Sequence, residues 1–226
     1  MPYELLVQQN QLVHTGYFSH PLFELWGDGK TILGGLFEAF SPYGTNLPDI
    51  RVEPGLVSPS EQVITVNIGL MGLHRFRFDR VESTFFNFSD DTLLKIPGII
   101  EASAKWIRVA VSSLKFASHQ FVYSSHCQVA NFLSKDVLGP ICASPVKSGG
   151  IDLGSGVIFH WEVPDRNWTT QLVLDRSVIV KNGLYMMFTL LVPGEVSDYA
   201  TLARDARSYI ENVLGELGLT FNKASM

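Results

Sequence analysis

Two apolar runs flank the segment Val180–Leu184, and they form the most regular pattern in the chain. Between the runs stands Asn182-Gly183, a pair that favours a type I′ turn because both central residues of that turn need a positive φ. The pattern predicts a hairpin with strands Trp168–Val180 and Leu184–Val192. A preceding strand, Val157–Val163, completes the expected antiparallel meander.

The strand predicted at Leu184–Val192 is apolar on both of its faces. Strands of this kind are usually covered on both sides. The strand before it is less regular, because Asp175-Arg176-Ser177 interrupts its apolar positions. We therefore expect other elements or a partner to cover much of this meander.

A helix is predicted after Pro193-Gly194, which stops the sheet. Ser197 is expected to be its N-cap, with Asp198 at the positive end of the helix dipole. Gly218 has the position of a helix-ending glycine. The apolar residues that share one face of this helix are Tyr199, Leu202, Ala203, Ala206, Ile210, Val213 and Leu217. Such a stripe packs on a sheet or on a partner.

A second amphipathic helix is predicted from Ile96 to Leu114, with Pro97 in its first turn. Its apolar positions recur at helical spacing, and charged residues occupy the opposite side. We expect Ile107 to be buried and Lys105 and Arg108 to lie on the solvent side.

The remaining elements have weaker patterns. Glu4–His14 is predicted as a strand whose polar centre suggests a sheet edge or a solvated face. A short helix is predicted at Thr31–Phe40, although Gly34-Gly35 weakens it. Further strands are predicted at Ile50–Leu56, Gln62–Leu70, Leu73–Phe88 and Gln120–Val129, with a turn at Met71-Gly72 and an irregular segment at Asn131–Ile151.

This order of elements predicts an α+β fold, in which antiparallel sheet carries two long amphipathic helices packed on one side. The 226 residues are interpreted as a single domain, 1–226. The element order also suggests two similar β-rich halves, 1–92 and 93–226, although no sequence repeat indicates a duplication.

Composition narrows the class of protein. The net charge is −5, and 17% of residues are charged, below the usual fraction of about one-quarter. With 15 Phe, 7 Tyr and 4 Trp, the chain must bury much apolar surface in a core or against a partner. The acidic balance argues against nucleic-acid binding, which needs a basic surface.

The sequence also bears on location. It contains no run of about twenty apolar residues, the length that a membrane-spanning helix needs. The N-terminal residues lack a signal-peptide pattern, and two cysteines provide no disulfide framework. We therefore expect a cytoplasmic protein without a membrane span.

The histidines and cysteines form no metal-binding pattern. His126 precedes Cys127, but neighbours on a strand point to opposite faces and the spacing of zinc ligands is missing. His74 shares a face with Phe76 and Phe78, so it is interpreted as a core histidine held by a hydrogen bond. The sequence predicts no metal and no cofactor.

Catalytic motifs are also missing. Ser124-Ser125-His126 places hydroxyls beside an imidazole, but catalytic triads are assembled in space rather than in sequence. Cys127 lacks the flanking residues of known cysteine hydrolases. The glycine-rich stretch Gly149–Gly156 leads into a strand, whereas phosphate-binding loops follow a strand and open a helix. We assign no catalytic residue, and the order of residues 140–156 is left open.

Three hypotheses for function remain. The first is a non-enzymatic binding or assembly protein that uses a sheet-and-helix surface to form a homo-oligomer or to bind a protein partner. The second is a helix-grip-like protein that holds an apolar small molecule in a mostly apolar pocket. The pocket lining would come from Phe76, Phe78, Phe121, Tyr123, Phe159 and Phe188. The third is a hydrolase without a recognisable motif.

Overall fold

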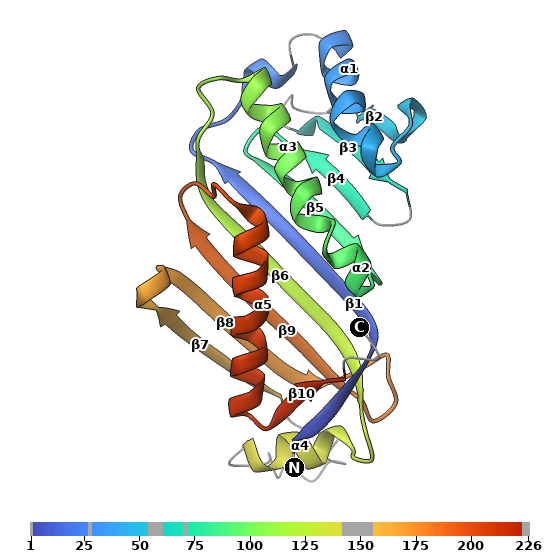
Figure 1. The fold of residues 1–226 in the computed structure, drawn as a ribbon, viewed down its shortest axis with the longest axis vertical. Coiled ribbons are helices and arrows are strands. Elements are labelled where there is room, and N and C mark those ends of the chain that lie inside the picture. Colours follow the sequence, from blue (N-terminus) through green and yellow to red (C-terminus); the bar gives the residue numbers. More distant parts are fainter. Residues whose placement is uncertain (1, 27–28, 54–60, 70–71, 142–155, 223–226) are drawn as a thin grey trace. The chain divides into compact units, whose positions relative to one another are not determined.

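The structure, a computed structural model, describes residues 2–26, 29–53, 61–69, 72–141 and 156–222. Its strands belong to one ten-stranded open sheet, in the order β2-β3-β4-β5-β1-β6-β9-β8-β7, with β10 paired to β1 (Figure 1). The strands are β1 (Tyr3–Phe18), β2 (Ile50–Glu53), β3 (Val63–Ile68), β4 (Gly72–Phe76), β5 (Arg80–Phe86), β6 (Phe116–Val129), β7 (Val157–Val163), β8 (Trp168–Arg176), β9 (Leu184–Pro193) and β10 (Leu219–Phe221).

Five α-helices and short 3-10 turns connect the described strands. The helices are α1 (Gly29–Phe40), α2 (Asp90–Leu93), α3 (Ile96–Ala110), α4 (Ser134–Ile141) and α5 (Tyr199–Glu216). The predicted α+β class, with antiparallel sheet and packed helices, is confirmed. None of the described helices has the length and hydropathy needed to cross a membrane.

The chain divides into two compact units. Unit 1 comprises Met1–Gln11, Val122–Leu190 and Arg204–Met226, and unit 2 comprises Leu12–Phe121 and Leu191–Ala203. Strands β1, β6 and β9 and helix α5 therefore contribute residues to both units. Each unit is described by itself below.

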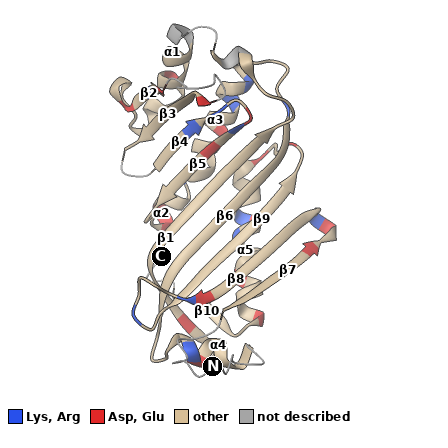
Figure 2. Ribbon diagram, turned by 180° about the vertical axis from the view of Figure 1, so that it is seen from behind, with Lys and Arg blue, Asp and Glu red and all other residues tan. Residues whose placement is uncertain are grey.

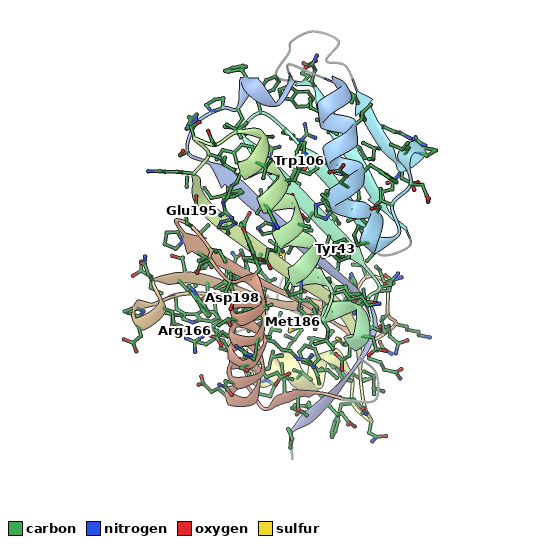
Figure 3. All side chains as sticks on the ribbon, turned by 45° about the horizontal axis from the view of Figure 1, so that its top comes forward. Tyr43, Trp106, Arg166, Met186, Glu195 and Asp198 are labelled. Carbon is green, nitrogen blue, oxygen red and sulfur yellow. The ribbon has the colours of Figure 1, made fainter. Side chains whose placement is uncertain are left out.

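In unit 2, helices α1 and α3 pack on each other and on one face of the neighbouring strands (Figure 1). Gly35 of α1 makes this close approach possible, because a Cβ atom there would lie 2.6 Å from Nε1 of Trp106 on α3 (Figure 3). Of the two glycines that weaken the helix prediction, Gly35 thus serves helix packing, whereas a Cβ atom at Gly34 would meet nothing within 4 Å. Phe40, Phe76 and Phe85 are fully buried in this core.

Helix α3 begins as predicted, with Pro97 in its first turn, and Ile107 is fully buried. Lys105 is exposed and Arg108 is partly exposed, so the predicted solvent side is confirmed. The helix ends at Ala110 rather than Leu114, because Val111 takes an extended conformation after donating the last helical hydrogen bond to the Ile107 carbonyl.

One predicted strand is wrong. Leu73–Phe88 is not continuous but forms the hairpin of β4 and β5, joined by a turn at Arg77–Arg80. The N–H of Arg77 donates to the carbonyl of Arg80 at 2.9 Å, and the Arg80 side chain bonds to Asp79 and Glu82. Alternating apolar residues continue through the turn, which is why the pattern concealed it.

In unit 1, Tyr209 of α5 holds the helix against the strands. Its hydroxyl accepts a hydrogen bond of 2.6 Å from the indole N–H of Trp161 on β7. Its ring lies 5.9 Å from that of Trp168 and 6.3 Å from that of Phe188. Arg166 stacks over Trp168 and also bonds to Asp205 of α5.

Both ends of α5 are well defined. The N-cap is Asp198 rather than the predicted Ser197, because the Asp198 carboxylate accepts the backbone N–H of Thr201 at 2.9 Å. Gly218 follows the helix with a φ of 72°, as expected for a helix-ending glycine. Within the predicted apolar stripe, Ile210 and Val213 are only half-buried.

The turn between β8 and β9 differs from the prediction, although the hairpin itself is confirmed. Strand β8 ends at Arg176 rather than Val180, and Ser177–Gly183 forms the loop. The Ser177 hydroxyl accepts the N–H groups of Ile179 and Val180. Asn182 has a φ of 57°, but Gly183 is outside the left-handed region, so no type I′ turn forms.

Two further predictions are corrected. β1 extends to Phe18 and lies between β5 and β6, so it is not an edge strand, although Gln8 and Gln9 are exposed. The segment predicted as irregular contains α4, because Pro140 and Gly139 masked a short helix. The strand predicted at Ile50–Leu56 is observed from Ile50 to Glu53, and residues 54–56 lie outside the described residues. Met71 of the expected Met71-Gly72 turn and residues 142–155 also lie outside them, whereas Gly72 begins β4.

Candidate functional site

Unit 2 buries a row of three histidines on strands beneath its helices. His74 lies on β4, His14 on β1 and His119 on β6, and each is at most 1% exposed. In the strand order β4-β5-β1-β6, β1 and β6 are adjacent, whereas β5 separates His74 from His14. Because the residues are far apart in the sequence, no local motif could reveal this row.

His14 and His119 form a direct imidazole pair. Nε2 of His14 and Nδ1 of His119 lie 3.1 Å apart, so one ring donates a hydrogen bond to the other. Aromatic rings surround the pair: Phe121 lies 4.7 Å from His14, and Phe116 lies 4.6 Å from His119. Tyr199, the first residue of α5, stands edge-on to both imidazoles at 5.9 and 5.6 Å.

Burial keeps all three histidines neutral. Desolvation lowers the pKa of His74 to about 3 and the pKa of His119 to about 4. The pKa of His14 is also lowered well below its usual value, first by desolvation and then by the neighbouring histidines. A general base that works near neutral pH needs a pKa closer to 7, so these histidines are poorly suited to that role.

His74 has a separate partner. Its Nδ1 lies 2.9 Å from the hydroxyl of Ser83 on β5, and both side chains are fully buried. The interpretation of His74 as a hydrogen-bonded core histidine is therefore confirmed. A serine beside an imidazole can act as a nucleophile only where substrate reaches it, and this pair is shielded from solvent.

Glu195 closes the same region from the segment before α5 (Figure 3). One carboxylate oxygen accepts the N–H of Phe116 at 2.5 Å, and the other accepts a bond from Arg108 of α3 at 2.5 Å. The charge of Glu195 raises the pKa of His119 and that of Arg108 lowers it, but desolvation dominates both effects. The pair thus connects β6, α3 and the start of α5 without charging the histidines.

Unit 1 has a different candidate surface, because β7 is the last strand in the sheet order. Its residues alternate between half-buried and exposed, and none of the seven is fully buried. Val157, Phe159, Trp161 and Val163 share the face that α5 covers, yet they remain partly exposed. Ile158, on the opposite face, is 58% exposed. An apolar edge strand of this kind is available for pairing.

The face opposite α5 continues across β8 and β9. The register places Ile158 beside Val173 and His160 beside Gln171, and Tyr185 and Met187 of β9 alternate with buried residues. Figure 2 shows these strands without a described helix in front of them. Within β7, β8 and β9 the charged residues are Glu162, Asp175 and Arg176. This surface therefore mixes apolar side chains with uncharged polar ones and carries few charges.

A second serine–histidine contact lies in unit 1. Nδ1 of His126 is 2.8 Å from the Ser177 hydroxyl, which also accepts two backbone N–H groups. These two bonds engage the oxygen lone pairs, so the hydroxyl donates its proton to His126. An oxygen with both lone pairs engaged is a poor nucleophile, and the contact is better explained as a loop cap.

Cys127 is buried next to Ser125, and desolvation raises the pKa of its thiol to about 11. A reactive cysteine needs a lowered pKa and access to solvent, so Cys127 has the properties of a packing residue. Its neighbour His126 is partly exposed on the other face, where its ring lies 4.9 Å from Tyr185. The predicted separation of His126 and Cys127 on opposite faces is confirmed.

The six residues proposed to line a pocket are divided between the units. Phe76, Phe78 and Phe121 belong to unit 2, and Tyr123, Phe159 and Phe188 belong to unit 1. Phe76 is fully buried against Trp106, and Phe188 is almost fully buried near Trp161 and Tyr209. The apolar pocket remains a prediction.

Among the described residues, no group of three or more His, Cys, Asp or Glu side chains is arranged to hold a metal ion. His14 and His119 use one nitrogen each to bond to the other, which makes them unsuitable as a ligand pair in this arrangement.

Comparison of the chain with protein-family models gives no match, and comparison with curated protein sequences gives none either. The function must therefore be argued from the chemistry of the two surfaces described above.

Proposed function

We propose that the protein is a non-enzymatic assembly protein that joins a second copy of itself through β7 of unit 1. The observation that carries the proposal is the exposed apolar edge of β7, which among the described residues pairs only with β8. Edge strands in monomeric proteins are usually protected by charge, by proline or by a covering element.

The other end of the sheet provides an internal comparison. β2 is also a terminal strand, but two of its four residues are the exposed charged side chains of Arg51 and Glu53. β7 has seven residues and one charged side chain, Glu162. Charge on an edge strand opposes pairing with another chain, so β7 is the better edge for assembly.

The residue pattern of β7 suits pairing with itself. In an antiparallel arrangement centred on His160, Val157 would face Val163 of the partner subunit, and Phe159 would face Trp161 of the partner subunit. Cross-strand pairs of aromatic and β-branched residues stabilise sheets. A two-fold axis makes both halves of such an interface identical, as this near-symmetric pattern requires.

The alternatives have less support. The serine–histidine contacts of the described residues disfavour the hydrolase hypothesis. The contact of His74 with Ser83 is buried, and the Ser177 hydroxyl that bonds to His126 is engaged in capping. The third contact, at 3.0 Å, joins two exposed neighbours in the sequence, Ser19 and His20. Phe76 and Phe188 already pack against neighbouring rings, which disfavours the apolar pocket. A cytoplasmic setting is part of the proposal, and the buried free thiol of Cys127 is compatible with it.

Sedimentation equilibrium or light scattering over a range of concentrations tests the proposal. The native protein is expected to approach twice its chain mass of 25.1 kDa. Ile158→Glu places a carboxylate opposite Glu162 of the partner subunit in this register, and like charges directly opposite each other destabilise a strand pair. The variant is expected to give a monomer with an unchanged circular dichroism spectrum. Val178→Glu is the matched control, because Val178 is 94% exposed in the β8–β9 loop and should leave association unchanged.

Cysteine cross-linking tests the proposed register, in a background with Cys142→Ser. Residues opposite each other at a two-fold axis have Cα atoms about 4.5–5.5 Å apart, within the range for a disulfide. His160→Cys is therefore expected to form a covalent dimer on oxidation. Glu162→Cys is the control, because its two copies would be roughly 13 Å apart at about 3.3 Å per residue.

The proposal fails if the native chain remains a monomer at high concentration, or if Val178→Glu and Ile158→Glu reduce association equally. A dimer that persists in Ile158→Glu would show that assembly uses a different surface.

A further inference from the structure

Two neighbouring loops at one end of unit 1 expose apolar side chains. They are residues 130–133, between β6 and α4, and Ser177–Gly183, between β8 and β9 (Figure 1). The N–H of Ser134 donates to the Asn182 carbonyl at 3.0 Å, so the two loops lie side by side. The large apolar side chains of these loops that are between 38% and 94% exposed form an apolar tip: Phe132, Leu133, Val178 and Ile179. Grouped exposed apolar residues indicate a surface for a protein partner or a membrane.

The β8–β9 loop satisfies much of its own backbone hydrogen bonding. The N–H of Gly183 donates to the Val180 carbonyl at 2.9 Å, and the N–H of Ser177 donates to the Gly183 carbonyl at 2.8 Å. The Ser177 hydroxyl accepts the N–H groups of Ile179 and Val180. Backbone polar groups that enter an apolar medium without partners lose their bonds to water at a large cost. A loop that makes these bonds internally can present Val178 and Ile179 to hydrocarbon at lower cost.

Positive charge lies beside the apolar tip. Lys181 belongs to the β8–β9 loop, Lys135 lies in the first turn of α4, and both are exposed. Neither forms an ion pair with an acidic side chain among the described residues. Of the acidic residues in the same segments, Asp136 and Asp175 accept backbone N–H groups at 2.8 and 2.6 Å, which holds their carboxylates at the backbone. The lysine amines, on long flexible stems, are the charges that can follow the tip to a surface.

We propose that the apolar tip inserts into the surface of an anionic lipid bilayer, with Lys135 and Lys181 at the lipid phosphates. Val178 is 94% exposed, and a side chain with so few neighbours suits a deformable lipid surface, whereas a protein partner would need a cavity shaped to receive it. Burial of a few apolar side chains and attraction of cations to anionic lipids together give reversible, peripheral binding. The inference is independent of assembly through β7, because neither loop includes a residue of that strand.

Flotation with lipid vesicles tests the proposal. The native protein should float with vesicles of equal parts phosphatidylcholine and phosphatidylserine, and less with phosphatidylcholine alone. Val178→Ser removes apolar surface that lipid would bury, so the affinity should fall about tenfold. Val109→Ser is the matched control, because Val109 is also exposed but lies near the end of α3 in unit 2. It should bind as the native protein does.

Lys181→Gln tests the contribution of charge. Removal of one lysine beside an anionic surface should reduce the affinity about fivefold and weaken its dependence on salt. Lys105 is exposed on α3 of unit 2, so Lys105→Gln is the control and should change neither quantity.

A fluorescent label reports insertion directly. In a background with Cys142→Ser, the remaining Cys127 is buried, so Val178→Cys can be labelled with an environment-sensitive dye. The emission of the dye should shift to shorter wavelength when the anionic vesicles are added, and a quencher attached to the lipid chains should reduce it. The same dye on Val109→Cys should show neither change.

The proposal is overturned if the native chain does not float with the anionic vesicles, or if Val178→Ser and Val109→Ser bind them equally. Vesicle binding without a change in the dye at Val178→Cys would place the lipid contact elsewhere and would also overturn it. If Val178→Ser instead lowers the mass of the protein in solution, the apolar tip is a contact between copies of the chain, and the lipid proposal is wrong.

Discussion

Helix α3 of unit 2 buries eight of its residues, whereas the part of α5 that belongs to unit 1 fully buries only Leu214. Unit 2 gains a second helix, α1, that packs on α3 and seals the region. Unit 1 relies instead on the ring contacts of Tyr209 with Trp161, Trp168 and Phe188. Similar strands are thus covered to different degrees.

The difference in helix coverage between the two units is matched by a difference in the burial of their histidines. The closed region of unit 2 holds uncharged histidines that water cannot reach freely, whereas the histidines of unit 1, His126 and His160, remain partly or fully exposed. Burial shifts the pKa of a histidine because the charged form loses its hydration. Unit 2 should therefore respond to acid more strongly than unit 1.

The largest expected effect is acid destabilisation of unit 2. In the unfolded chain these histidines bind protons near pH 6.5, but in the folded chain His119 does so only near 4 and His74 near 3. Between these values the unfolded state holds more protons, so stability falls as the pH falls. The free energy of unfolding should drop by up to about 1.4 kcal/mol per pH unit for each histidine.

Hydrogen exchange followed by mass spectrometry at pH 6.5 and at lower pH measures this effect by segment. Amides of α3 and β5 should lose protection before those of β8, after correction for the intrinsic effect of pH on exchange. Equal loss in both units would contradict the comparison. A His74→Phe variant should show a shallower dependence on pH, if it folds with its core intact.

Truncation of one isoleucine in each unit comes next. Ile107→Ala in α3 should cost about 2–5 kcal/mol, because it leaves a cavity in a closed core. Ile210→Ala in α5 should cost less, since its side chain is only half-buried. Lys105→Ala is the surface control and should change stability by less than about 0.5 kcal/mol. Denaturant midpoints and slopes decide between these outcomes, and equal losses for the two isoleucines would remove the contrast.

A smaller effect is expected at Glu195. Glu195→Ala removes the acceptor of the Phe116 N–H and the partner of Arg108, and should cost about 1–2 kcal/mol. Glu211→Ala, which removes the exposed ion pair with Arg207 in α5, should cost less than about 0.5 kcal/mol. Thermal unfolding at low and high salt measures both. A larger loss at Glu211 would show that the exposed side of α5 matters more than its burial suggests.

Metal removal is expected to have no effect on either unit. The described residues contain no cluster of potential ligands, and the thiol of Cys127 is buried with a raised pKa. Elemental analysis of untagged protein should give no stoichiometric metal, and a chelator should leave the thermal midpoint unchanged. Stoichiometric zinc bound near His126 or Cys127 would contradict this expectation.

The sequence predicted elements well where one pattern dominated. α3 was predictable because apolar residues recur at helical spacing over several turns and Pro97 marks the first. The division between β4 and β5 was hidden because Phe76 and Phe78 continue the alternation across the turn. There the backbone bond from Arg77 to Arg80 decides the structure, and local patterns do not encode it.

The predicted turn between β8 and β9 was also wrong, because a side-chain cap changes the loop. Asn182-Gly183 favours a two-residue turn, but the Ser177 hydroxyl binds the N–H groups of Ile179 and Val180 and ends β8 earlier. The candidate site was even harder to predict from the sequence, because His14 and His119 are 105 residues apart and meet only through the strand order. β7 itself was predicted correctly, but its terminal place in the sheet could not be read from its own residues.

The pairing of β1 with β10 has a consequence for the order of folding. Tyr3 and Leu5 of β1 lie opposite Leu219 and Phe221 in parallel register, and the N–H of Tyr3 donates to the Gly218 carbonyl at 2.7 Å. These partners are more than two hundred positions apart in the sequence. Contacts of such long sequence separation slow folding and leave strand edges exposed meanwhile. We therefore expect the β1–β10 pairing to form late in folding.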